Sequence, residues 1–168
     1  DYVKAVNRLH SLGVMINGSF VFGMDDDDKD VFKRTVDWGV EHAITTSTYH
    51  RQTPYPGTRL FMKMEAEGRI LTRNWDLYDT RHVVYKTNLL TSEELKKGYD
   101  WAYNEFYSWE NILKASWHHD SVKHKLKHLF YSGGCKKIEP LWNIIIKTQS
   151  LNNMLPILES ILSKANTQ

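Results

Sequence analysis

The chain has very little cysteine, since Cys135 is its one thiol among 168 residues. A single cysteine excludes an internal disulfide, and it excludes an iron–sulfur or zinc site built from several thiolates of this chain. The sequence also lacks an apolar run near the roughly 18 residues that a membrane-spanning helix needs, and it lacks a recognisable signal peptide. We therefore expect a cytoplasmic chain without a transmembrane segment.

Excess charge of one sign is also lacking, because 22 basic residues face 20 acidic ones and leave a net charge of +2. This balance makes nucleic acid an unlikely partner and argues against an anionic membrane. The hydrophobic share of 41% is sufficient for a buried core. An initiating methionine is absent, and Asp1 already stands in a helical pattern. We expect the chain to be a piece of a longer polypeptide.

The first 68 residues alternate between helical and extended patterns. Apolar spacing predicts a helix over residues 2–12, and the glycine-bounded apolar run 14–23 is typical of a strand buried on both faces. A helix, a strand and a second helix are predicted after the acidic loop, over residues 31–40, 44–53 and 59–68. This alternation predicts a parallel sheet with right-handed crossovers. Two strands are too few for an independent sheet, so we expect further strands from elsewhere.

A proline-rich turn follows the second predicted strand. Pro54 and Pro56 cannot donate to a strand ladder, Gly57 permits a tight bend, and Thr58 can cap the next helix. In α/β folds, ligands bind beyond the carboxyl ends of parallel strands. We therefore expect function at this turn.

The last part of the chain is predicted to be helical. Thr91-Ser-Glu-Glu94 is typical of a helix start, and the apolar repeat predicts a long helix over residues 92–115. Further helices are predicted over 118–131, 138–149 and 151–164, with Gly133-Gly134 as one of the breaks. The change of pattern divides the chain into residues 1–68, 69–115 and 116–168.

Three stretches resemble the C-terminal part of radical S-adenosylmethionine enzymes of the cobalamin-binding-domain type. They are Gly18-Ser-Phe-Val-Phe-Gly23 with its acidic loop, Thr53-Pro-Tyr-Pro-Gly-Thr58, and Trp75-Asp-Leu-Tyr-Asp-Thr-Arg-His-Val-Val84. The resemblance covers about residues 1 to 115. It implies an α/β fold made of the last two βα units of a partial (βα)6 TIM-like barrel, followed by an all-α extension.

The same resemblance implies the cofactors. These are S-adenosylmethionine, a 4Fe-4S cluster and, as a further option, cobalamin, in radical methyl transfer or rearrangement of a small-molecule substrate. The family's Cys-x3-Cys-x2-Cys loop is absent here, and Cys135 cannot replace it. We therefore expect no metal ligand in this chain and no activity of the isolated chain. Its expected partner is the missing N-terminal part of its own polypeptide.

The resemblance also implies, position by position, which residues of this chain line the pocket for cofactor and substrate. The expected contacts to the cofactor's adenine and ribose are Phe20, Phe22, Gly23, Gln52, Thr53 and Pro54. The residues expected on the substrate side are Tyr49, Arg51, Asp79, Arg81 and His82.

Several alternatives stay open at the level of sequence. The run Asp25 to Asp28 is read as a solvated loop with a helix cap in preference to a cation site. The last part carries four histidines that are read as a solvated basic helix face in preference to a metal site: His118, His119, His124 and His128. Other functions considered are a non-catalytic helical docking module and a basic helical domain that binds RNA or a membrane surface.

Overall fold

The structure is a computed structural model that describes residues 1–147, with side-chain burial described as far as residue 136. Its elements are α1 (Tyr2–Ser11), β1 (Asn17–Phe22), α2 (Val31–Glu41), β2 (Thr46–Arg51), α3 (Arg59–Ala66), the 3₁₀ turn η1 (Trp75–Leu77), α4 (Ser92–Phe106), α5 (Trp109–Trp117) and α6 (Val122–Lys147). The predicted helix over 151–164 lies outside the described residues. None of the described helices is long and apolar enough to cross a membrane.

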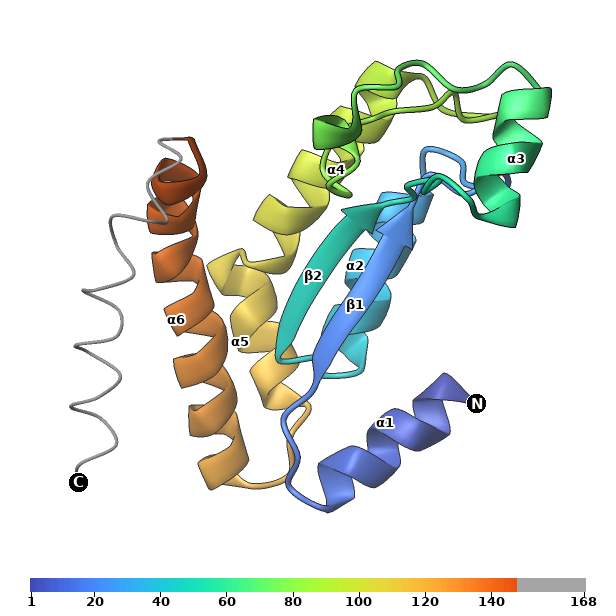
Figure 1. The fold of residues 1–168 in the computed structure, drawn as a ribbon. Helices are drawn as coiled ribbons and strands as arrows, with labels where there is room; N and C mark the ends of the chain where they lie inside the picture. Colours follow the sequence, from blue (N-terminus) through green and yellow to red (C-terminus); the bar gives the residue numbers. More distant parts are fainter. Residues whose placement is uncertain (148–168) are drawn as a thin grey trace.

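The two strands lie side by side and parallel, with Asn17 opposite Thr46 and Phe22 opposite Arg51. Helix α2 makes the crossover and lies behind the sheet in Figure 1, while α4 runs beside β2 and α5 packs on α2. The predicted strand–helix–strand unit is present. The prediction of a TIM-like barrel is wrong for the described residues, which form a small α/β arrangement around a sheet of two strands. The division at residues 68 and 115 stays a prediction.

One face of the sheet is covered and the other is open. Phe20, Phe22 and Tyr49 lie in the core cluster with Phe32, Val36 and Leu95. The opposite face carries side chains that are exposed or half-buried: Asn17, Ser19, Val21, Thr46, Thr48 and His50. The prediction that β1 is buried on both faces is wrong, because no described element covers this face. The polar side chains of β1 on this face, Asn17 and Ser19, already argued in the sequence against burial on both faces.

The outer edge of β2 is closed by groups from later in the chain. Ser47 N–H donates to the Tyr107 hydroxyl over 2.9 Å, and Tyr49 N–H donates to the Tyr103 hydroxyl over 3.2 Å. Arg51 N–H donates to the Thr80 carbonyl over 2.7 Å. These bonds satisfy edge donors that a neighbouring strand would otherwise take, so β2 is a terminal strand among the described residues.

Two helix boundaries differ from prediction. The long helix predicted over 92–115 is broken, because Ser108 caps a new helix by accepting the Asn111 N–H over 3.2 Å. Conversely, Gly133 and Gly134 do not break α6, which runs from Val122 to Lys147. A cap outweighed the continuous apolar repeat in the first case, and tertiary packing outweighed low helix propensity in the second.

The expectation of a solvated histidine face is wrong for His119 and His128, whereas His118 is exposed and His124 is half-buried. His119 and His128 are 7% and 1% exposed, and their rings are joined by a hydrogen bond of 3.1 Å between His119 Nε2 and His128 Nδ1. His10 of α1 meets His119 edge-on, with 5.0 Å between ring centroids. These histidines therefore join α1 and α6 in the interior.

Candidate functional site

The carboxyl end of β1 is held by a buried tyrosine. Gly23 has φ +95°, and a Cβ on it would lie 2.7 Å from the Tyr85 hydroxyl. That hydroxyl donates to the Gly23 carbonyl and lies 3.1 Å from Gln52 Oε1. Glycine is needed here because Tyr85 occupies the space that a side chain would fill. Tyr85 therefore links the ends of both strands.

The acidic loop after β1 is ordered by its own aspartates. Asp27 Oδ2 accepts the N–H groups of Gly23 and Met24 over 2.8 and 2.9 Å. Asp30 stands at the N-cap of α2 without a side-chain cap bond. The first aspartate of the loop, Asp25, instead points toward Lys63 and Arg69.

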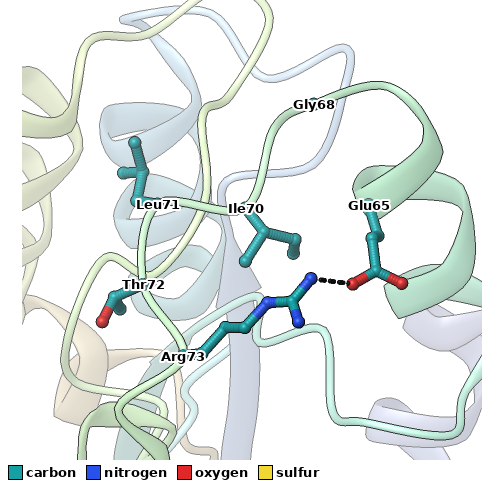
Figure 2. A pocket seen from close by; sticks show the side chains of 6 residues that line it. All are labelled: Glu65, Gly68, Ile70, Leu71, Thr72 and Arg73. Carbon is teal, nitrogen blue, oxygen red and sulfur yellow. Dashed lines mark hydrogen bonds and ion pairs between the residues drawn. The ribbon is translucent and has the colours of Figure 1, made fainter.

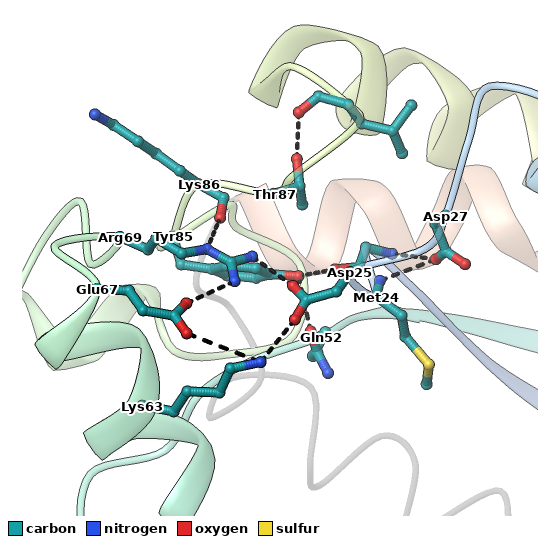
Figure 3. Close-up of polar contacts among 12 residues, drawn as sticks. Met24, Asp25, Asp27, Gln52, Lys63, Glu67, Arg69, Tyr85, Lys86 and Thr87 are labelled. Carbon is teal, nitrogen blue, oxygen red and sulfur yellow. Dashed lines mark hydrogen bonds and ion pairs between the residues drawn. The ribbon is translucent and has the colours of Figure 1, made fainter.

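Asp25 is the centre of an ion-pair network (Figure 3). Arg69 Nη2 lies 2.7 Å from its carboxylate and Lys63 Nζ lies 2.9 Å from it. Hydrogen bonds from Arg69 and then Lys63 lower the pKa of Asp25 below its usual range. Arg69 also donates to Glu67 over 3.0 Å and to the Lys86 carbonyl over 2.7 Å. The network joins the β1 loop, α3 and the segment before α4.

The proline turn after β2 has the predicted local structure. Gly57 has φ +82°, and Thr58 caps α3 by accepting the Phe61 N–H over 3.2 Å. Gln52 N–H donates to the Phe22 carbonyl over 2.8 Å, so its side chain starts where the sheet ends. Gln52 and Thr53 are half-buried, whereas Pro54 is buried.

The residues expected to contact the cofactor are thus distributed over two environments. Phe20 and Phe22 stack on Tyr49 on the covered face of the sheet, with centroid distances of 5.8 and 5.3 Å. Gln52 and Thr53 stand at the strand end with surface still accessible. Contact of any of the six with a cofactor stays a prediction.

The residues expected on the substrate side also fall into a buried group and an exposed group. Tyr49 is buried, and loss of solvent raises the pKa of its hydroxyl. Asp79, Arg81 and His82 are exposed. Asp79 Oδ1 accepts the backbone N–H groups of Arg81 and His82 and lies 3.0 Å from His82 Nδ1. Desolvation acts to raise the pKa of Asp79, but the hydrogen bonds from Arg81 and His82 outweigh it, so this pKa is lowered. Arg51 is buried at the end of β2. Their substrate role stays a prediction.

A surface pocket lies away from the strand ends. It is lined by Glu65, Gly68, Ile70, Leu71, Thr72 and Arg73 (Figure 2). Arg73 pairs with Glu65 over 2.6 Å, so the charged groups of the pocket already satisfy one another. None of the predicted site residues lines it. We therefore place the candidate site at the strand ends.

Sequence reasoning missed three residues that shape the site: Tyr85, Arg69 and Tyr99. The structure shows a single antiparallel bridge from Tyr85 to Ile70. The contact of Tyr85 with Gly23 spans 62 residues of sequence. No local pattern signals such a contact. Among the described residues, no group of three acidic, histidine or cysteine side chains is placed to hold a metal ion.

Comparison with known proteins gives three informative relatives, while no family model matches the chain. The chain is 32% identical over 114 residues to bacteriochlorophyllide d C-12(1)-methyltransferase of Chlorobaculum tepidum, which covers 68% of the chain. It is 32% identical over 111 residues, or 66% of the chain, to an uncharacterized methyltransferase of Pyrococcus horikoshii. It is 28% identical over 116 residues, or 67% of the chain, to bacteriochlorophyllide d C-8(2)-methyltransferase of Chlorobaculum tepidum. The matches span 24% to 25% of these relatives, about a quarter of their length.

These relatives correct the family resemblance drawn from the sequence. Their names state methyl transfer, and none names radical chemistry, an iron–sulfur cluster or cobalamin. The assignment to the cobalamin type of radical S-adenosylmethionine enzyme is therefore replaced by a likeness to methyltransferases. The same relatives overturn the expected function of a radical-enzyme fragment. They also give no support to a docking module or to an RNA- or membrane-binding domain, because all three are named methyltransferases.

Proposed function

We propose that this chain is part of an S-adenosylmethionine-dependent methyltransferase. The observation that carries the proposal is the likeness over 111 to 116 residues to three proteins whose names all state methyl transfer. Because the chain spans about a quarter of their length, we propose that it acts together with further polypeptide corresponding to the rest.

The residues at the strand ends fit part of such a cofactor. The Gln52 amide and the Thr53 hydroxyl are half-buried and offer both donors and acceptors to ribose hydroxyls and adenine nitrogens. Gly23 has a different role, since Tyr85 occupies the space beside it. When bound, S-adenosylmethionine supplies the methyl group, and S-adenosylhomocysteine remains after transfer.

The chain's own contribution is to hold and orient the adenosine end of the cofactor. Gln52 Oε1 is held near the Tyr85 hydroxyl, and Thr53 Oγ1 donates to the Arg51 carbonyl over 3.1 Å. Both side chains are thereby fixed before a ligand arrives, which lowers the entropic cost of binding.

Titration with S-adenosylhomocysteine tests the cofactor part of the proposal. We expect calorimetry to detect binding to the chain, and Gln52→Ala to weaken it about three- to tenfold through loss of one hydrogen bond. Asn104→Ala is the matched control, because Asn104 is an exposed amide on α4. Equal affinity of Gln52→Ala and the native chain would contradict the assignment, provided that thermal melting shows both folded.

Methyl transfer itself is tested in a polypeptide extended to the relatives' length. Two relatives are named for bacteriochlorophyllide d, so a chlorin of this kind is the first small-molecule acceptor to test. We expect label from methyl-labelled S-adenosylmethionine in the chlorin and an equal amount of S-adenosylhomocysteine. Release of S-adenosylhomocysteine without labelled chlorin would move the search to another acceptor, and absence of both products would sink the proposal.

A further inference from the structure

Arg51 is a buried cation at the carboxyl end of β2. Its side chain is 7% exposed, and desolvation lowers the pKa of its guanidinium. Both backbone groups of Arg51 are hydrogen-bonded, since its N–H donates to the Thr80 carbonyl and its carbonyl accepts from Thr53 Oγ1. The guanidinium Cζ lies 4.2 Å from the centroid of the Tyr99 ring. The group is therefore held in position, with one planar face on an aromatic ring.

The guanidinium lacks the hydrogen bonds that a buried cation needs. Within the described part of the chain, Arg51 Nε is buried without any partner. Nη2 is 3.9 Å from Asp100 Oδ1, which is too far for a hydrogen bond, and the Asp100 side chain is 58% exposed. A buried charge is costly when one of its donors has no hydrogen bond and its ion pair is long and largely exposed.

Arg69 provides the comparison within the same chain. Its side chain is 10% exposed, close to the value for Arg51, yet its three nitrogens donate to Asp25, Glu67 and the Lys86 carbonyl over 2.7 to 3.0 Å. Among the described residues, all three nitrogens of Arg69 are thus satisfied, whereas Arg51 has a buried Nε without a partner and an ion pair of 3.9 Å with Asp100. Packing alone does not account for this difference, because replacing an unsatisfied charge by an apolar side chain would stabilise the fold.

We propose that Arg51 is the binding group for a carboxylate of a ligand at the strand ends. The planar guanidinium presents paired N–H donors that match the two oxygens of a carboxylate, and stacking on Tyr99 fixes the plane of this fork. The inference rests on the proposed function, in which a carboxylate comes from either the amino-acid end of the cofactor or the methyl acceptor. Desolvation raises the pKa of the Tyr99 hydroxyl, and the charges of Arg51 and of exposed Arg81 oppose this rise.

The binding is tested by NMR of the Arg51 Nε–H resonance in the chain labelled with ¹⁵N. We expect sodium acetate to shift this resonance in a saturable manner, against sodium chloride of equal ionic strength. The resonance of Arg69 Nε–H, which already donates to a carbonyl, is the internal control and should not move. An Arg51 resonance that acetate leaves unchanged overturns the inference.

Two nucleoside probes then distinguish the source of the carboxylate. S-adenosylhomocysteine carries the amino-acid carboxylate, whereas 5′-methylthioadenosine is the same nucleoside without it. A shift with the first and not the second assigns Arg51 to the cofactor. A shift with acetate alone, while calorimetry shows S-adenosylhomocysteine bound, assigns it to the acceptor. If calorimetry shows no nucleoside binding but acetate still shifts Arg51, the proposed function fails and the carboxylate site stands.

Variants separate a ligand role from a structural one. Arg51→Lys keeps the charge and loses the fork, so we expect acetate affinity to fall about tenfold. Arg51→Met removes the charge at similar length, and we expect its melting temperature to be equal to or above that of the native chain. Arg59→Met, at an exposed site in α3, is the control for loss of a charge. A lower melting temperature of Arg51→Met, with unchanged acetate affinity of Arg51→Lys, would identify Arg51 as structural.

Discussion

The Tyr107 hydroxyl replaces a neighbouring strand at one residue of β2. It accepts the Ser47 N–H over 2.9 Å and donates to the Ser47 carbonyl over 3.0 Å, and all of these groups are buried. Tyr107→Phe leaves both backbone groups without this partner while the ring stays in place. We expect the free energy of unfolding to fall by about 1 to 3 kcal/mol, measured by urea denaturation.

A surface tyrosine provides the control for removal of a hydroxyl group. Tyr131 is 50% exposed, so Tyr131→Phe should change the free energy of unfolding by less than about 0.5 kcal/mol. If Tyr107→Phe proves as mild as Tyr131→Phe, the hydroxyl does not close the strand edge.

Helices α2 and α4 approach each other closely at two glycines. A Cβ at Gly98 of α4 would lie 2.1 Å from the Phe32 ring, and one at Gly39 of α2 would lie 3.1 Å from Phe106. The first distance is far below van der Waals contact, so the buried Phe32 ring or one of the helices would have to shift. We expect Gly98→Ala to lower the free energy of unfolding by about 1 to 3 kcal/mol despite the better helix propensity of alanine.

The matched control is Gly134→Ala in α6. A Cβ there would meet no atom within 4 Å, so only the propensity gain applies and stability should rise by up to about 1 kcal/mol. Opposite signs of these two substitutions in chemical denaturation are the expected result. A stabilising Gly98→Ala would mean that α2 and α4 do not pack at this distance.

At the scale of the whole molecule, a buried histidine cluster ties the first helix to the last described one. Burial first, then the charges of His10 and other histidines, lowers the pKa of His119 to about 4, with Asp120 opposing weakly. Burial and the charge of His119 lower the pKa of His128 to about 4. Their hydrogen bond needs one ring nitrogen to donate and the other to accept, so double protonation abolishes it.

The folded chain therefore binds fewer protons than the unfolded chain between pH 4 and the ordinary histidine pKa of about 6.5. Stability contributed by neutral histidines is complete above pH 6.5 and is lost as the pH falls toward 4. We expect the free energy of unfolding to drop by about 2 kcal/mol between pH 6.5 and 5, before most carboxylates titrate.

His128→Gln should flatten this pH dependence, whereas His82→Gln should leave it unchanged because His82 is exposed. The measurement is a series of urea denaturations at each pH. Parallel profiles for native chain and His128→Gln would show that the cluster does not set acid stability.

Local structure was largely predictable from the sequence. The helix over 2–12, the cap at Thr58, the helix start at Thr91 to Glu94, and the strands after Gly13 and Ala43 all lie near their predicted positions. Each depends on hydrogen bonds between near neighbours or on a short repeat of apolar residues, and both are visible in a few consecutive residues. The local structure of the turn at residues 53–58 was predictable to the same degree, since it follows from its prolines and glycine, whereas Tyr85 and Arg69 reach the site through contacts distant in sequence.

The sequence by itself therefore determined the order of helices and strands as far as α3, the cap at Thr58 and the parallel pairing of β1 and β2. Only the tertiary structure decided which charged and polar groups are paired. Arg51 and Arg69 are alike in sequence, yet partners 17 and 44 residues away satisfy Arg69, while no described residue accepts a hydrogen bond from Arg51 Nε. His119 and His128 were expected in solvent and are buried against α1. Such pairings depend on segments that meet only after folding, and no local pattern records which segments meet.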